Sequence, residues 1–134
     1  TQELTPIVCV GETLAEREED KTTEVIKDQL AQGLKDVTAE NILKLVIAYE
    51  PVWAIGTGKT ATPQQAQQIH KFIRDWLKDT YDFDTAEQVR ILYGGSVKPS
   101  NIKDLMKEPD VDGGLVGGAS LEVVSFSEIV KGSI

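Results

Sequence analysis

Four short runs of apolar residues recur along the chain, and longer amphipathic segments separate them. The runs cover residues 6–10, 45–49, 90–93 and 114–116. Their apolar residues are nearly continuous rather than alternating, which is typical of strands that are covered on both faces of a parallel sheet. We therefore expect four short parallel strands.

The segments between the runs carry apolar residues at helical spacing. Residues 63–80 predict the clearest helix, with Thr62 as its N-cap and Pro63 at the first helical position. Residues 13–35 predict a second long helix, which we expect to bend near residues 21–22. Both segments are long enough to connect two parallel strands.

Two shorter helices are predicted nearer the C-terminus. Residues 100–107 start with Ser100 as a cap, and residues 126–131 follow Ser125 as a cap. The order of strand and helix thus repeats four times, which indicates an α/β fold of parallel βα units. No linker-like composition divides the chain, so we expect one domain over residues 1–134.

Composition narrows the classes of function. Of the 134 residues, 40% are hydrophobic and 27% are charged, which is ordinary for a folded domain with a core. The formal net charge of −8 disfavours nucleic acid and anionic membranes as partners. No stretch approaches the roughly 20 apolar residues of a membrane span. The single cysteine cannot form an internal disulfide, so we expect a cytoplasmic location.

Polar or glycine-rich residues follow every predicted strand. Parallel α/β folds keep their functional sites at the carboxyl ends of the strands, so we expect a site at this edge of the sheet. The residues are Gly11 with Glu12, Glu50, Gly94 with Gly95 and Ser96, and Gly117 with Gly118.

Glu50 is the first candidate for chemistry. It ends the second predicted strand, and the apolar residues Val52 and Trp53 follow it closely. A carboxylate among apolar groups is desolvated, which raises its basicity and makes it a candidate general base. A member of a surface ion pair is the alternative interpretation for a carboxylate in this position.

Residues 51–61 have the composition of a lid. Gly56 and Gly58 lie within a segment that is otherwise largely apolar and has stiffer ends. A hinged apolar loop of this kind expels water when it closes over a site. The alternative is an ordinary βα loop with two turn glycines.

Two glycine pairs follow the last two predicted strands. Gly94 and Gly95 precede Ser96, and Gly117 and Gly118 follow the fourth run. Glycines allow backbone N–H groups to approach an anion closely. Two such loops in succession, beside a lid, predict a phosphate site, and tight turns without a ligand are the alternative.

The other chemistry-bearing residues are expected to be structural. Cys9 lies within an apolar run, so we expect a buried thiol. His70 lies in the middle of a predicted helix and is expected to face solvent or the helix flank. Glu12 either orients the lid or pairs with Arg17. The sequence offers no metal-ligand cluster, no Ser–His–Asp set and no dinucleotide fingerprint, so no metal and no cofactor are expected.

Four segments together resemble the triosephosphate isomerase family. They are VCVGETLAERE, AYEPVWAIGTGKTATP, RILYGGSVKPSN and DGGLVGGASL. Their order and spacing are similar to those of the C-terminal half of that family's (β/α)8 barrel, which needs about 250 residues. The resemblance implies that this chain supplies the last four strands and helices of such a barrel.

The resemblance also implies a reaction. The family interconverts dihydroxyacetone phosphate and D-glyceraldehyde 3-phosphate through an enediolate, without a cofactor. Glu50 would be the base that moves a proton between two carbons. The residues that would hold the substrate phosphate are Gly56, Ser96, Gly117 and Gly118.

A closing lid and its supports are implied in the same way. Glu12 and Trp53 would form a pair near the lid hinge, Leu115 would be an apolar wall against the base, and Ser96 would help to latch the lid. The lid and latch residues would be Pro51, Val52, Trp53, Ala54, Ile55, Thr57, Gly58, Lys59, Thr60, Ala61 and Tyr93.

The family's electrophilic histidine and active-site lysine belong to the N-terminal half of the barrel. A positioned base alone typically supplies a factor of about 10²–10⁴, whereas enzymes accelerate reactions by at least about 10⁶. We therefore expect this chain alone to be inactive, and to need the N-terminal half as a partner. The full-length parent is expected to be a homodimer.

Two alternatives to this function stay open. The chain could be a non-catalytic half-barrel that binds phosphorylated ligands, or that pairs with a second copy through its open sheet edges. It could also belong to an enzyme of the same lineage that acts on a four-carbon sugar phosphate.

Overall fold

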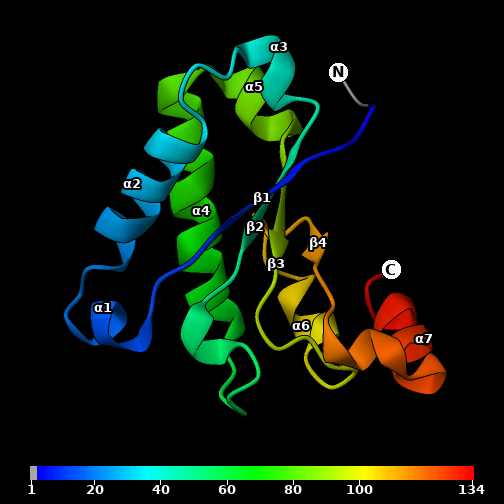
Figure 1. Ribbon diagram of the computed structural model, residues 1–134. Coiled ribbons are helices and arrows are strands. Elements are labelled where there is room, and N and C mark those ends of the chain that lie inside the picture. Colours follow the sequence, from blue (N-terminus) through cyan, green and yellow to red (C-terminus); the bar gives the residue numbers. More distant parts are fainter. Residues whose placement is uncertain (1–2) are drawn as a thin grey trace.

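A four-stranded parallel sheet forms the centre of the computed structural model, which describes residues 3–134 (Figure 1). Its strands follow one another in sequence order, as expected for consecutive βα units. They are β1 (Ile7–Val10), β2 (Val46–Tyr49), β3 (Arg90–Tyr93) and β4 (Gly113–Gly114). The predicted α/β fold is confirmed, and a parallel sheet of this kind is consistent with half of a (β/α)8 barrel.

The strand register aligns the carboxyl ends of the first three strands. Val10 pairs with Tyr49, and Tyr49 pairs with Tyr93. The residues that directly follow these strands therefore come together at one edge of the sheet. The fourth strand ends at Gly114 rather than continuing to residue 116, although the N–H of Leu115 still donates to the carbonyl oxygen of Tyr93 at 2.9 Å.

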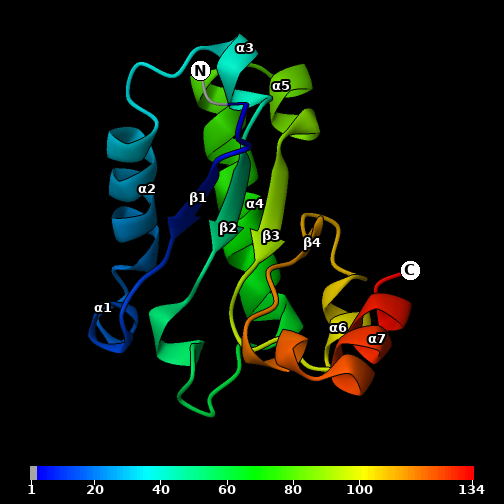
Figure 2. The same ribbon diagram turned by 45° about the vertical axis from the view of Figure 1, so that its right-hand side comes forward.

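Helices α2 (Thr22–Gly33) and α4 (Pro63–Thr80) pack against the strands and against each other (Figure 2). In Figure 2, α4 lies behind the sheet, and no helix lies in front of β1, β2 and β3. Cys9 is exposed, and so is Ile7 on the same side of β1, with 47% of its surface accessible. The prediction of a buried Cys9 is wrong, because the helices cover only the other face of this edge strand.

Helix α4 begins as the sequence predicts. Thr62 accepts a hydrogen bond from the N–H of Gln65, whose side chain in turn accepts one from the N–H of Thr62, and Pro63 occupies the first turn. The predicted position of His70 is wrong, since its side chain is fully buried. Ala66 lies four residues earlier, so His70 falls on the stripe of α4 that faces the sheet.

The predicted bend near residues 21–22 is confirmed, and it separates two helices. The short helix α1 (Leu14–Glu18) is capped by Thr13, and α2 follows after a turn. Asp20 in this turn has a φ of 57°, a left-handed conformation that a helix cannot accommodate. This break turns α1 away from α2 and places it beside the carboxyl end of β1.

Two of the predicted caps are wrong. Ser100 lies in a turn, and α6 (Ile102–Leu105) begins after Asn101. Ser125 lies inside α7 (Val123–Gly132), which begins after Glu122. The structure also contains short elements that the apolar pattern did not predict, because each is too short to show a helical period. These are α3 (Ala39–Ile42), α5 (Phe83–Gln88), η1 (Val52–Ala54) and η2 (Gly118–Leu121).

The buried side chain of Arg74 ties α4 to the carboxyl half of the chain. Its guanidinium donates to the carbonyl oxygens of Ala86 and Val89 at 2.6 Å and to Asp112 Oδ2 at 2.7 Å. The same Asp112 oxygen accepts the backbone N–H of Ile91 at 2.7 Å. These hydrogen bonds hold Asp112, the residue directly before β4, and therefore help to position β4 and the loop that follows it.

Candidate functional site

Glu50 lies at the carboxyl end of β2, between the ends of two neighbouring strands. Its N–H donates to the carbonyl oxygen of Val10 at 2.7 Å, which continues the pairing of β1 and β2 by one residue. A Cβ atom at Gly94 would overlap the Cγ of Glu50, and one at Gly11 would overlap the carbonyl oxygen of Glu50. Glycine on both neighbouring strands therefore makes room for Glu50.

The side chain of Glu50 is half-buried, and Cys9 of β1 is its neighbour on the open face of the sheet. Partial desolvation, together with the adjacent Glu50 carboxylate, raises the pKa of Cys9 to about 11. The thiol therefore stays protonated at neutral pH. It adds no negative charge beside Glu50, and it is poorly suited to act as a nucleophile.

The segment 51–61 begins with mostly buried residues, which form its root, and residues 55–60 form an exposed tip before the buried Ala61. Pro51, Trp53 and Ala54 are buried, whereas residues 55–60 are exposed. Gly56 and Gly58 have φ angles of 66° and 78°, which glycine adopts without strain. The root fixes the start of the segment, and the two glycines give its tip the conformational freedom that a lid requires.

Glu12 holds the root of this segment. Its Oε1 atom accepts hydrogen bonds from Trp53 Nε1 at 2.9 Å, Tyr49 Oη at 3.1 Å and Arg17 Nη1 at 3.0 Å. The carbonyl oxygen of Glu12 also accepts the N–H of Val52 at 3.0 Å. The two roles weighed for Glu12, contact with the segment 51–61 and an ion pair with Arg17, therefore exist together.

A cavity of about 260 Å³ joins the tip of the segment 51–61 to the two glycine-rich loops. All four residues expected to bind phosphate line it, although they come from three separate loops. The lining consists of Ile55, Gly56, Gly94, Gly95, Ser96, Val97, Lys98, Gly117, Gly118 and Ala119. Gly94 also contacts Glu50, so the cavity and the candidate base lie next to each other.

Lys98 and Asn101 are parts of this site that the sequence reasoning missed. Lys98 brings a cation to the cavity wall. Asn101 Oδ1 accepts the N–H of Lys98 and Asn101 Nδ2 donates to the carbonyl oxygen of Ser96, each at 2.8 Å. The signal was the position of Lys98 two residues after Ser96, in a loop that already carried the glycine pair.

Tyr93 and Leu115 lie beside the cavity rather than in its wall. The Tyr93 hydroxyl is buried against Gly95 and has no hydrogen-bond partner among residues 3–134. Burial raises the pKa of Tyr93, and the nearby backbone N–H of Ala61 opposes that effect. The N–H of Leu115, the residue after β4, donates to the carbonyl oxygen of Tyr93 at the end of β3, so these two residues lie side by side.

Between residues 3 and 134, no group of three or more His, Cys, Asp or Glu side chains is placed to hold a metal ion. Over that range, no helix combines the length and the apolar character needed to cross a bilayer.

The fold and the site define a class of protein, namely parallel α/β proteins whose site lies at the carboxyl ends of the strands. The model of the family described as triosephosphate isomerase matches residues 1–133, and the chain belongs to this family.

Relatives named triosephosphate isomerase are similar over nearly the whole chain. The protein of Endomicrobium trichonymphae is 62% identical over 129 residues, which are 96% of this chain and 51% of the relative. That of Carboxydothermus hydrogenoformans is 61% identical over 131 residues, which are 98% of this chain and 52% of the relative. That of Chloroherpeton thalassium is 59% identical over 129 residues. The chain spans about half the length of these relatives.

Proposed function

We propose that this chain supplies the C-terminal half of a triosephosphate isomerase, which interconverts dihydroxyacetone phosphate and D-glyceraldehyde 3-phosphate. The observation that carries the proposal is the position of Glu50 over Gly94, at the edge of the cavity that the segment 51–61 and the glycine-rich loops line together. Gly94 contacts the candidate base and also lines the cavity that would bind an anion, so the two sites are close enough to act on one small phosphorylated substrate. The names of the relatives support the same reaction.

In this proposal Glu50 takes a proton from one carbon of the triose and returns it to the next, through an enediolate. The backbone N–H groups of Gly56, Gly117 and Gly118, with the region of Ser96, bind the phosphate. Tyr93 and Ser96 latch the closed segment 51–61. Leu115 acts as an apolar wall, and closure excludes water around Glu50 and strengthens it as a base.

The described residues supply no side chain that is placed to donate a hydrogen bond to the substrate oxygens while Glu50 removes a proton. His70 does not fill this role, because it is fully buried and its Nδ1 lies 3.1 Å from the carbonyl oxygen of Asp110. Burial lowers the pKa of His70 to about 4, and its ring packs against Tyr49 and Tyr93. Charge that develops on the enediolate oxygens would need donors from outside this chain.

The N-terminal half of a barrel is the partner that would supply these donors. The sheet face with Ile7 and Cys9 is open, and β1 and β4 are edge strands that a further strand can extend. A homodimeric parent and a cytoplasmic location are further parts of this proposal; the first rests on the resemblance to the family and the second on the single cysteine.

Complementation tests the proposal. We expect this chain, joined to the N-terminal half of the Carboxydothermus hydrogenoformans relative, to isomerise D-glyceraldehyde 3-phosphate. Each half alone should show no turnover. Glu50→Asp should lower kcat of the joined protein by about 10² or more, because it withdraws the base from the substrate. Glu128→Asp, at an exposed position of α7, is the matched control and should leave kcat unchanged.

Three results would overturn the proposal. The first is a joined protein that folds but turns over no triose phosphate, and the second is a Glu50→Asp variant with the parental rate. The third is faster turnover of a four-carbon sugar phosphate than of the triose phosphate. Affinity for inorganic phosphate without turnover, together with a dimer of this chain in sedimentation, would instead indicate the non-catalytic half-barrel, which the names of the relatives do not favour.

A further inference from the structure

Arg17 contacts both Glu12 and Trp53, the two residues whose hydrogen bond holds the root of the segment 51–61. Its Nη1 donates to Glu12 Oε1 at 3.0 Å, and its Cζ atom lies 4.7 Å from the centre of the Trp53 ring. Trp53 in turn donates to the same Glu12 oxygen. Arg17, Glu12 and Trp53 thus form a closed triangle in which each member contacts the other two.

The charge of Glu12 explains why this triangle needs a cation. The carboxylate of Glu12 is fully buried, and two of the three donors to its Oε1 atom, Tyr49 and Trp53, are neutral. Within the described part of the chain, its Oε2 atom accepts no hydrogen bond. Arg17 is the residue that forms an ion pair with Glu12, so it compensates the buried charge that orients the Trp53 indole.

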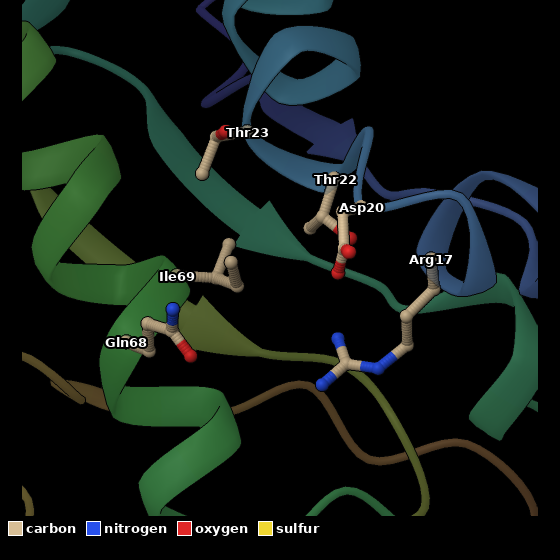
Figure 3. Close-up of a pocket in the computed structure, with 6 residues that line it drawn as sticks. All are labelled: Arg17, Asp20, Thr22, Thr23, Gln68 and Ile69. Atoms are coloured by element: carbon tan, nitrogen blue, oxygen red, sulfur yellow. The ribbon is translucent and has the colours of Figure 1, made fainter.

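Arg17 reaches this triangle from outside the candidate site. It lines a separate cavity of about 280 Å³. Figure 3 shows its guanidinium at the edge of this cavity, which lies between α4 and the segment that joins α1 to α2. Asp20, Thr22 and Gln68 line the same cavity. The side chain of Arg17 is 23% exposed, and it is not part of the wall of the cavity that the glycine-rich loops line.

We propose that Arg17 is a positioning residue for the segment 51–61, and this inference rests on the proposed function of that segment as a lid. The ion pair keeps Glu12 as an acceptor for the indole N–H, and the guanidinium plane limits tilting of the indole. Trp53 then stays fixed while the glycine-containing tip moves. Motion of the lid is therefore confined to its tip, and its root at Trp53 keeps one position in the open and closed states.

Fluorescence of Trp53 tests this role without any catalysis. In a Trp76→Phe background of this chain, Trp53 is the single remaining tryptophan. We expect Arg17→Met to add a nanosecond component to the decay of Trp53 anisotropy, which reports motion of the indole. Arg17→Lys keeps the charge but not the planar group, and should give a smaller component. Arg90→Met removes an exposed arginine and should leave the decay unchanged.

Two results of this experiment would overturn the inference. One is an Arg17→Met variant that folds and has the parental anisotropy decay. The other is loss of the fold in both Arg17 variants, as judged by circular dichroism, with Arg90→Met still folded. In that case Arg17 supports the whole chain rather than the position of Trp53.

Kinetics of the protein completed with an N-terminal half provide a second readout. A loosened lid binds the phosphate less well and closes less completely, so Arg17→Met should lower kcat/KM by roughly tenfold, with an increase in KM. Arg17→Lys should recover part of this loss. A parental KM in Arg17→Met would contradict the inference, whereas absence of turnover in the completed parent would contradict only the proposed function.

Discussion

The side chain of Glu50 lies directly across Gly94, so that a Cβ atom at position 94 would stand 2.5 Å from the Cγ of Glu50. These residues follow adjacent strands, and the strand register brings them side by side. Gly94 also lines the cavity beside the segment 51–61. One glycine therefore serves both the candidate base and the candidate phosphate cradle.

Gly94→Ala tests this relationship. The added methyl group should displace the Glu50 side chain, which can rotate away, so we expect a large loss of kcat in the completed protein and a small change in thermal stability. A loss of about tenfold to a hundredfold is the usual effect of misplacing a catalytic group by about 1 Å. Steady-state kinetics and thermal melting measure the two effects separately.

Gly33→Ala is the matched control for this substitution. A Cβ atom at Gly33, the last residue of α2, would be in ordinary contact with Val8 at 3.8 Å. If Gly94→Ala has the same kinetics as the parent, the position of the Glu50 side chain does not depend on the absence of a Cβ atom at residue 94.

His70 should make the chain less stable in mild acid. Its folded pKa is about 4, below the value of 6.5 for an unperturbed histidine, chiefly because of burial. The unfolded chain therefore takes up a proton at His70 first, and the free energy of unfolding falls as the pH is lowered from 6.5 to 4. The loss attributable to this group is about 3 kcal/mol.

Urea denaturation at several pH values measures this effect. Asp110 and Asp112 raise the pKa of His70 and Arg74 lowers it, so these three side chains must be kept unchanged. His70→Gln removes the titrating group and should flatten the dependence between pH 6.5 and 5. Identical slopes in the parent and His70→Gln would refute the assignment.

Arg74 should be one of the most sensitive positions for stability. Its side chain is buried and donates to Asp112, Ala86 and Val89. Arg74→Met would remove the guanidinium donor to the carbonyl oxygens of Ala86 and Val89 and the positive charge beside Asp112, and should lower the free energy of unfolding by about 3–5 kcal/mol. Lys71→Met removes an exposed cation of the same helix and should leave the denaturation midpoint unchanged. Equal midpoints in the two variants would contradict the prediction.

Lys98 should contribute to phosphate affinity. It is the lysine in the wall of the cavity that the tip of the segment 51–61 and the glycine-rich loops form. Lys98→Met removes a positive charge from this wall and should weaken binding of inorganic phosphate by about fivefold to tenfold, measured by titration calorimetry. Lys103→Met, at an exposed position on α6, should have no effect. Equal affinities for all three proteins would exclude Lys98 from the phosphate cradle.

Local chemistry made several elements predictable. Residues 90–93 form β3 and residues 63–80 form α4, as the apolar pattern indicates. The cap at Thr62 was also predictable, because its reciprocal hydrogen bonds involve only residues three positions apart. Short elements with few apolar residues, such as α5, give no comparable signal.

Burial was less predictable, because it depends on what packs against a residue. Cys9 has an apolar sequence context but lies on an edge strand, on the face without helices. His70 is a polar residue between Ile69 and Lys71, but it lies four residues after Ala66, on the buried stripe of α4. In both cases the tertiary packing, rather than the local sequence, decides the exposure of the side chain.

The sequence by itself determined the order of the βα units and the residue types at the carboxyl ends of the strands, including Glu50 and the glycine pairs. These follow from periodicity and turn chemistry, which act over a few residues. The tertiary structure alone decided that Glu50 lies over Gly94, and that Glu12 accepts hydrogen bonds from Tyr49 and Trp53, 37 and 41 residues away. Such contacts depend on strand register and helix packing, which bring distant residues together and are not encoded in any single segment.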